Sequence, residues 1–190
     1  MIIKLDKLSA LIIEDMQNDF MPSGALPVPD SDKLVPVLNK YIEKFASHKY
    51  QIFASRDWHP PDHISFKQRG GEWPVHCVKN THGAEFHEDL KIPKDSTIIS
   101  KAADRDIEAY SSFKGTDLAE RLRMQGIKRV FIGGVATDYC VKDTALDAVK
   151  LGFDVVLLQD AVKEIKYGDE AIKEMQSRGV KIVSINDLQG

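Results

Sequence analysis

Cysteine is scarce in this sequence, because the 190 residues contain only Cys77 and Cys140. Two cysteines cannot form the disulfide framework that holds small secreted proteins together. In a reducing compartment a thiol is more often structural, metal-binding or catalytic, so the surrounding residues must decide its role. Internal repeats, low-complexity tracts and flexible linkers are also missing. We therefore expect a single domain over 1–190, a usual length for one hydrophobic core.

Long apolar runs are absent as well. The longest stretches, such as 155–158, fall far below the roughly 20 residues that a membrane span requires. The N-terminal segment carries Asp6 before any apolar run develops, and no small-residue cleavage site follows it, so a signal peptide is not expected. These features favour a cytoplasmic protein that does not cross a membrane.

Neither sign of charge dominates. The 26 Lys and Arg residues against 29 Asp and Glu residues give a net charge of -3, with no basic patch to bind a nucleic acid. Apolar residues make up 43% of the chain and charged residues 29%, which is typical of a globular protein and excludes a disordered one. A small-molecule substrate fits this composition better than a polyanionic partner.

Short, nearly continuous apolar runs recur along the chain, at 9–15, 50–57, 97–102, 129–135, 154–160 and 180–185. Such runs are typical of strands that are buried on both faces. Segments with helical periodicity lie between most of these runs, at 31–47, 115–125, 138–151 and 168–178. The alternation predicts a Rossmann-like α/β fold, a three-layer sandwich in which helices cover both faces of a mostly parallel sheet of about six strands.

Reactive side chains stand at the ends of several predicted strands. Asp15, Asp57 and Lys101 end three of the apolar runs, and Cys140 lies just beyond a fourth. One acid or lysine at a strand end is usually a solvated boundary. Four such residues at one sheet edge predict an active site, because ligands of parallel sheets bind outside the carboxyl ends of the strands. The segment 57–96 shows little periodicity, and a loop of this length is often functional.

Cys140 is the candidate nucleophile. Small residues ending the strand before it permit a tight turn, and Thr137 or Asp138 could cap the helix that follows. The thiol would then lie in the first helical turn, where backbone N–H groups and a nearby Lys101 are expected to lower its pKa. A buried inert cysteine is the alternative for Cys140. Cys77 has no strand–turn–helix context and is the weaker candidate nucleophile.

Amide hydrolysis needs a nucleophile, a group that accepts and returns a proton, and donors for the developing oxyanion. A carboxylate beside the thiol can have a raised pKa that suits it to protonating the departing ammonia. Asp15 and Glu14 are both candidates, and because neighbouring strand residues point to opposite faces, we expect only one to reach the site. Backbone N–H groups of the 133–140 turn are the candidate oxyanion donors.

A candidate metal site follows the strand at 50–57. Asp57 and His59 are two residues apart, so their side chains point the same way at a strand end. With a further imidazole they would form a common ligand set for Zn²⁺, Fe²⁺ or Mn²⁺. The loop offers several histidines that spacing does not separate: His63, His76, His82 and His87. A solvated histidine-rich loop is the alternative, and Ser65 could add a weak or water-mediated contact.

Aromatic side chains near these positions could stack against a planar substrate. They are Phe20, Trp58, Trp73 and Tyr110. For any one of them, packing in the core is the alternative interpretation.

Motifs that occur together in one known family run through nearly the whole chain. They are IIEDMQNDFMPSGALPVP at 12–29, SRDWHPPDHISF at 55–66, WPVHCVKNTHGAEF at 73–86, ISKAADRDIEAYSSF at 99–113 and GGVATDYCVKDTALDA at 133–148. On these motifs the chain resembles the nicotinamidase/pyrazinamidase branch of the isochorismatase-like cysteine hydrolases. The resemblance implies an isochorismatase-like fold and the hydrolysis of nicotinamide to nicotinic acid and ammonia, a step of NAD salvage. Pyrazinamide is the implied second substrate.

The resemblance also implies the roles of individual residues. Asp15, Lys101 and Cys140 would form the catalytic triad, which selects Asp15 over Glu14. In the implied reaction Asp15 accepts the thiol proton, Cys140 forms a thioester, and Lys101 holds the charges in register. The backbone N–H groups of Ala136 and Cys140 would form the oxyanion hole, after a cis peptide bond between Val135 and Ala136.

The implied metal site consists of Asp57, His59 and His76, with Ser65 as a weaker fourth position. Zn²⁺ is the favoured ion, with Fe²⁺ and Mn²⁺ as alternatives, and it would orient the pyridine ring of the substrate. The residues implied to contact the substrate are Phe20, Trp73, Tyr110, Val135 and Ala136.

Three other interpretations compete with this one. The chain could be a different hydrolase of the superfamily, either an isochorismatase or an N-carbamoyl amide hydrolase, although these branches generally lack the complete metal set. It could also be a non-catalytic binding protein that keeps the fold, which the intact triad disfavours. A homo-oligomer is a further expectation, because relatives often form dimers or larger assemblies.

Overall fold

A parallel sheet forms the centre of the computed structural model, which describes residues 2–189. Its six strands lie in the order β4-β3-β2-β5-β6-β7, and every neighbouring pair is parallel. Their bounds are β2 (Ser9–Glu14), β3 (Gln51–Asp57), β4 (Thr97–Lys101), β5 (Arg129–Val135), β6 (Asp154–Lys163) and β7 (Lys181–Val183). The predicted α/β fold with a mostly parallel sheet of about six strands is confirmed.

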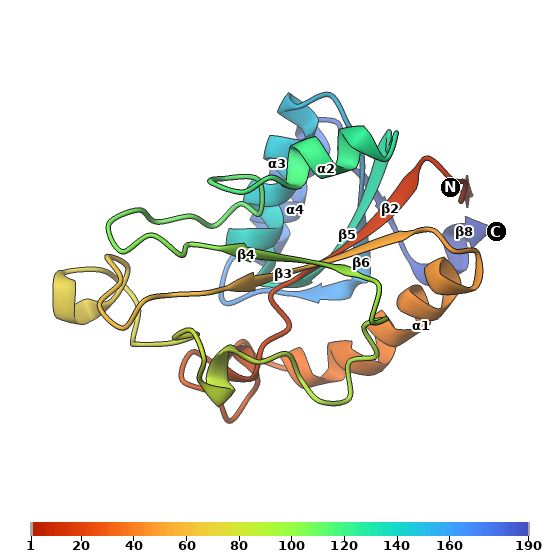
Figure 1. Cartoon of the computed structure of the whole chain (residues 1–190). Helices are drawn as coiled ribbons and strands as arrows, with labels where there is room; N and C mark the ends of the chain where they lie inside the picture. The colour runs from red at the N-terminus through yellow and green to blue at the C-terminus, as the bar shows by residue number, and fades with distance from the viewer. Residues whose placement is uncertain (1, 190) are drawn as a thin grey trace.

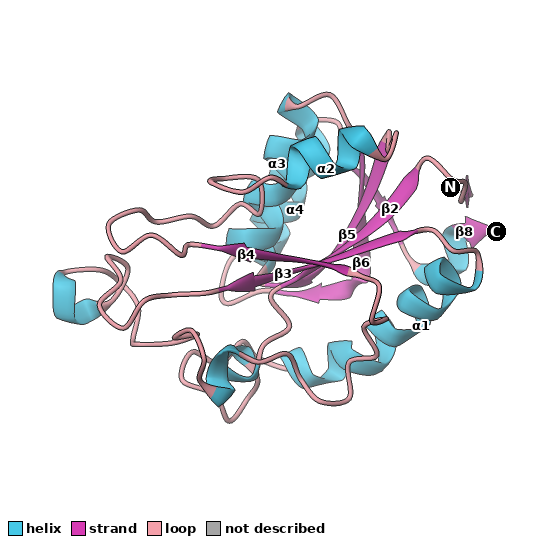
Figure 2. Cartoon of the chain, viewed as in Figure 1, coloured by secondary structure: helices cyan, strands magenta, loops and turns pink. Residues whose placement is uncertain are grey.

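Four α-helices cover the two faces of the sheet (Figures 1 and 2). They are α1 (Leu34–Ser47), α2 (Leu118–Met124), α3 (Lys142–Lys150) and α4 (Gly168–Ser177). The α1 helix packs on one face, while the other three helices pack on the opposite face. The hydroxyl of Tyr41 in α1 donates a 2.5 Å hydrogen bond to Asp160 of β6, which ties the helix to the sheet.

Strand β2 shows why the apolar runs are continuous. Leu11 and Ile13 belong to the core beneath α1, whereas Ala10 and Ile12 belong to the core beneath the other three helices. All four side chains are at most 1% exposed. Because successive strand residues face opposite layers and both layers are apolar, alternation between apolar and polar residues disappears.

Several element boundaries differ from the prediction. The helix predicted to begin near residue 138 is preceded by a π-helical turn, η5 (Thr137–Val141), and the segment 31–47 begins with a 3-10 turn, η2 (Ser31–Lys33). The predicted side-chain cap is wrong, because the carboxylate of Asp138 instead accepts the backbone N–H groups of 165–167. A small parallel pair of β1 (Ile3–Lys4) and β8 (Leu188–Gln189) was not predicted, since two-residue strands carry no periodic pattern.

The long segment after β3 contains short 3-10 turns, η3 (Lys67–Arg69) and η4 (His82–Ala84), which agrees with its weak periodicity. This segment and the chain after β4 extend from the carboxyl ends of the sheet in Figure 1. Within residues 2–189, no helix has both the length and the apolar character needed to span a membrane.

Candidate active site

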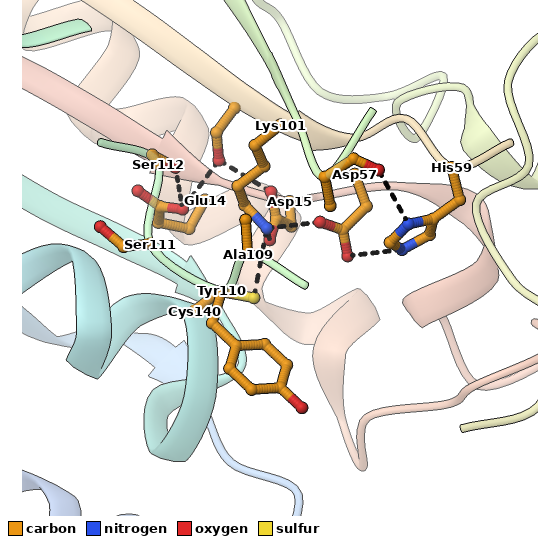
Figure 3. Close-up of polar contacts among 12 residues, drawn as sticks. Glu14, Asp15, Asp57, His59, Lys101, Ala109, Tyr110, Ser111, Ser112 and Cys140 are labelled. Atoms are coloured by element: carbon orange, nitrogen blue, oxygen red, sulfur yellow. Dashed lines mark hydrogen bonds and ion pairs between the residues drawn. The ribbon is translucent and has the colours of Figure 1, made fainter. Parts of the chain in front are cut away.

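The strand ends singled out in the sequence meet at one edge of the sheet (Figure 3). Asp15 directly follows β2, Asp57 ends β3, Lys101 ends β4, and Cys140 lies in the η5 turn after β5. The exposed fraction of each of these residues is at most 6%. Four chemically reactive groups are therefore gathered in one largely buried cluster.

Lys101 is the centre of this cluster. Its Nζ lies 2.9 Å from Asp15 Oδ2 and 3.4 Å from Cys140 Sγ, and it also pairs with Asp57 Oδ1. Burial disfavours the charged ammonium, but the carboxylates of Asp15 and Asp57 outweigh it and hold the pKa of Lys101 well above its ordinary value. The lysine therefore stays cationic and holds the thiol and both carboxylates in place.

Asp15 lies at a sharp change of backbone direction. Its φ of 50° is in the left-handed region, and its N–H donates to the carbonyl of Ser55 on the neighbouring strand. The turn places its carboxylate against Lys101 instead of continuing the strand. Burial raises the pKa of Asp15, and the Lys101 charge opposes that rise. A carboxylate in this environment is suited to accept a proton and to return it.

The tight connection between β5 and η5 places Cys140 in the site. The Val135–Ala136 peptide bond is cis, as the resemblance implied, and Ala136 O accepts the N–H groups of Tyr139 and Val141. Gly134 has a φ of 125°, and a Cβ at this position would lie 2.1 Å from Glu14 O, so only glycine fits beside β2.

The predicted lowering of the Cys140 pKa is wrong. Burial raises the pKa of the thiol well above its ordinary value, although Lys101 acts in the opposite direction. The helical position was expected to favour thiolate, but the residue is only 6% exposed and its sulfur faces two carboxylates as well as the lysine. The resting thiol is therefore protonated and needs a base, which the adjacent Asp15 can supply.

Asp57, His59 and His76 form a second cluster beside the first. Their ligand atoms all lie within 4.8 Å of one another, and all three residues are at most 5% exposed. The Nδ1 of His76 contacts Pro74 O at 2.8 Å and that of His59 contacts Ala102 O at 3.3 Å, which leaves both Nε2 atoms facing Asp57 Oδ2.

This arrangement fits a divalent metal ion. A ring nitrogen that donates to a carbonyl fixes the imidazole tautomer and leaves the other nitrogen free to bind metal. Consistent with that, His59 Nε2 is buried without a hydrogen-bond partner among the described residues. Asp15, Asp57 and Cys140 also lie close enough to share an ion, but the Lys101 ammonium contacts all three and takes that place.

The other candidate ligands of the loop have different partners. The Ser65 hydroxyl lies 2.7 Å from Nδ1 of His63, and the His63 ring is tilted against the His59 ring with 4.2 Å between the ring centroids. His82 is exposed and pairs with Glu85 at 3.2 Å. His87 is half-buried and accepts the N–H of Asp89. The structure thus groups His76 with Asp57 and His59, and the assignment of Ser65 stays a prediction.

A pocket opens beside both clusters and is lined by Cys140 and by the three residues of the metal-ligand set. Four residues predicted to contact the substrate line it, namely Phe20, Trp73, Tyr110 and Ala136, whereas Val135 is buried beneath the lining. The Trp73 ring donates a 2.9 Å hydrogen bond to the Tyr110 hydroxyl, which fixes this wall. Four further lining residues of the pocket were not identified from the sequence: Leu26, Glu108, Tyr139 and Ile165.

Comparison with known proteins identifies the family of the chain. The isochorismatase domain pattern matches residues 9–187. The chain belongs to the isochorismatase family. Nicotinamidase from Escherichia coli is 34% identical over 95% of this chain and 96% of its own length. The nicotinamidase/pyrazinamidase of Mycobacterium tuberculosis is 35% identical over 93% of this chain and 98% of its own.

Solved structures of isochorismatase family proteins have the same fold. The pyrazinamidase of Pyrococcus horikoshii in complex with zinc is 60% identical, with a TM-score of 0.91 over 93% of this chain and 99% of its own. PnC1 from Leishmania infantum, in complex with nicotinate, is 34% identical, with a TM-score of 0.91 over 100% of this chain and 99% of its own. The resemblance predicted from the motifs is confirmed.

Proposed function

We propose that this protein is an amide hydrolase that converts nicotinamide to nicotinic acid and ammonia and also accepts pyrazinamide. One observation carries the proposal: a buried lysine joins a carboxylate to a thiol that lines a pocket, and a metal-ligand set lines the same pocket. Relatives at 34–36% identity that cover most of the chain are nicotinamidases.

The proposed acylation step uses the geometry around Lys101. Asp15 accepts the proton of Cys140, and the sulfur attacks the carboxamide carbon to form a tetrahedral oxyanion. Asp15 then gives the proton to the amide nitrogen as the C–N bond breaks, so ammonia leaves and a thioester remains. Lys101 stays charged beside both groups, which stabilises the thiolate while the proton is away.

Deacylation repeats the two roles of the same carboxylate. Asp15 takes a proton from water, the hydroxide attacks the thioester carbonyl, and the returning proton restores the Cys140 thiol. The products are the free acid and the original enzyme, so atoms and protons balance. The backbone N–H groups of Ala136 and Cys140 are the proposed oxyanion donors, in keeping with the place of both residues in the pocket lining.

We propose that Asp57, His59 and His76 hold a Zn²⁺ ion, the metal in the complex of the Pyrococcus horikoshii relative. When bound, the ion would supply a Lewis-acidic point of attachment for the ring nitrogen of the substrate. Phe20 and Trp73 would hold the faces of the ring, and the carboxamide would then lie toward Cys140.

Ammonia release from nicotinamide by purified protein tests this function. Turnover that falls after chelation and returns with Zn²⁺, with metal content measured on the same sample, is the expected result. Benzamide is the matched control substrate, because it has the same carboxamide without the ring nitrogen, and we expect its KM to be much higher. A folded, zinc-loaded protein that leaves nicotinamide intact would refute the proposal.

A further inference from the structure

Glu14 is a buried acid that the proposed reaction does not use. It ends β2 next to Asp15 and is fully buried, yet no cation contacts it among the described residues. Its Oε2 contacts two hydroxyls, Ser55 Oγ at 2.8 Å and Ser112 Oγ at 2.7 Å, and its Oε1 has no partner within the described chain. A buried carboxylate without a cation partner destabilises the folded protein, so such an acid is expected to be protonated or to have a function.

Ser55 joins this acid to the proposed proton carrier. Its Oγ lies 2.8 Å from Glu14 Oε2 and equally 2.8 Å from Asp15 Oδ1. A hydroxyl has one proton and can donate it to only one of these two oxygens. The other contact therefore needs a second proton, which must belong to one of the carboxyl groups.

The charges around the cluster decide which carboxyl group carries that proton. Lys101 pairs with Asp15 and Asp57, so both have a cation partner, while Glu14 has only hydroxyls. Burial and the nearby charge of Asp15 raise the pKa of Glu14 to about 8. Glu14 is thus the protonated member at neutral pH. Its proton can point to Ser55 Oγ, which leaves the Ser55 proton for Asp15 Oδ1.

We propose that Glu14 is a positioning residue that, as a neutral acid, donates to Ser55 and thereby makes Ser55 donate to Asp15. Ser112, from the chain after β4, donates to the same Glu14 oxygen and holds the acid in place. Asp15 is then fixed by Ser55 on one oxygen and by Lys101 on the other, with its proton-accepting edge toward Cys140. Figure 3 shows Glu14, Ser112, Asp15 and Lys101 converging in this way.

This inference rests on the proposed function, and three variants test it. Glu14→Met removes the donor at similar side-chain length, and we expect kcat to fall about fivefold with KM unchanged, because the substrate does not touch this residue. Glu14→Gln keeps a donor toward Ser55, and the Ser112 hydroxyl can turn to accept the second amide hydrogen, so we expect this variant to retain most of the wild-type kcat. Ser55→Ala removes the donor to Asp15, and kcat is expected to fall about tenfold.

The double variant decides whether Glu14 acts through Ser55. Adding Glu14→Met to Ser55→Ala should lower kcat by less than about twofold more. A further fivefold loss of kcat in the double variant would overturn the inference. A Glu14→Gln variant as impaired as Glu14→Met would overturn it as well, because the carboxylate charge would then matter. Full activity of a folded Met variant would overturn it too. Should Glu14→Met fail to fold, the comparison of Glu14→Gln with Ser55→Ala still decides.

A second readout separates this inference from the substrate assignment. The rate at which iodoacetamide alkylates Cys140 reports how readily Asp15 removes the thiol proton, whatever the substrate is. We expect this rate to follow kcat, reduced in Glu14→Met and Ser55→Ala and retained in Glu14→Gln. Mass spectrometry places the label on Cys140 rather than Cys77. If the wild-type protein does not hydrolyse nicotinamide but the three variants show the expected alkylation rates, the proposed function is wrong and the role of Glu14 stands. An alkylation rate in Ser55→Ala equal to that of wild type would overturn the role of Glu14.

Discussion

The two halves of the active site are built in different ways. The acid and the lysine of one half lie at strand ends of the sheet, and the thiol lies in the turn after β5, so pairing between neighbouring strands sets their places. The metal-ligand half takes Asp57 from the same sheet but His59 and His76 from the irregular chain that follows, where two backbone carbonyls orient the rings. The sheet therefore places the reacting groups, and a loop places the histidines that would orient the substrate.

The two halves share one link, the pairing of Lys101 with Asp57. Lys101 uses Asp57 Oδ1, which leaves Oδ2 facing the imidazoles. Burial opposes ionisation of Asp57, but the charge of Lys101, together with the contact to His59, prevails and keeps its pKa below the ordinary value. Variants of each half should therefore give distinguishable defects, and a variant of the link should affect both.

Removal of the nucleophile should have the largest effect. Cys140→Ala is expected to lower kcat at least about 10⁴-fold, the scale of losing a nucleophile that acts as part of a unit. Metal content should stay at the wild-type level, because the ligand set is untouched. Steady-state ammonia release and metal analysis measure both quantities. Cys77→Ala is the matched control and should remain active; Cys140→Ala retaining more than a few per cent of the activity would refute the nucleophile assignment.

Removing the charge of Lys101, which links the two halves, should have the next largest effect. Lys101→Met leaves Asp15 and Asp57 buried without their cation, so we expect about 3 kcal/mol less unfolding free energy and about 10³-fold lower kcat. Denaturant titration and kinetics measure the two changes. Exposed Lys114→Met is the control and should behave as wild type. A variant with unchanged stability would show that the two carboxylates do not depend on the lysine.

A change confined to the loop half should be smaller and of a different kind. We expect His76→Ala to lose bound metal and about 10²-fold in kcat/KM, mostly through KM, because substrate orientation suffers before the thiol does. Alkylation of Cys140 should stay within about threefold of wild type. The exposed His82→Ala is the matched control. Equal metal content in His76→Ala and wild type would argue against this ligand assignment.

The same division explains what the sequence could predict. Continuous apolar runs identified all six main strands, and because parallel strands share an edge, their terminal residues Asp15, Asp57 and Lys101 could be placed together from the amino-acid pattern alone. The loop residues lie outside the strands, so the pattern did not place them relative to one another. Spacing alone did not separate His76 from His63, and the choice came from the family resemblance. Tyr139 and Ile165 of the pocket wall gave no signal, since either could equally have been a core residue.

Pattern reasoning did not anticipate that Glu14 and Asp15 share a partner, although only Asp15 belongs to the proposed triad. Strand alternation predicted that Glu14 and Asp15 point to opposite faces, so that one of them leaves the site. The strand ends at Glu14, however, and the positive φ of Asp15 breaks the alternation at that residue. Both acids consequently reach Ser55. Backbone direction at a strand end depends on packing around it, which single-residue patterns do not encode.

Glu14 also gives the prediction with the smallest expected effect, on stability rather than catalysis. Burial and the Asp15 charge raise its pKa in the folded protein to about 8, from 4.5 for an ordinary glutamate. Between these values the native state holds a proton that the unfolded chain releases, so stability falls as pH rises through this window. Glu14→Gln cannot titrate, so wild type should lose about 2 kcal/mol relative to this variant between about pH 5 and pH 7.

Denaturant titrations of both proteins at about pH 5, 6 and 7 measure this difference. The metal site is the same in both, so its own titration cancels when the two free energies are subtracted. Exposed Glu88→Gln is the control and should run parallel to wild type over the range. If wild type and Glu14→Gln also run parallel, Glu14 is already ionised at the acidic end of the range. The hydroxyl of Ser55 would then face two carboxylates with a single proton, and the triad half would carry one more negative charge than its lysine can balance.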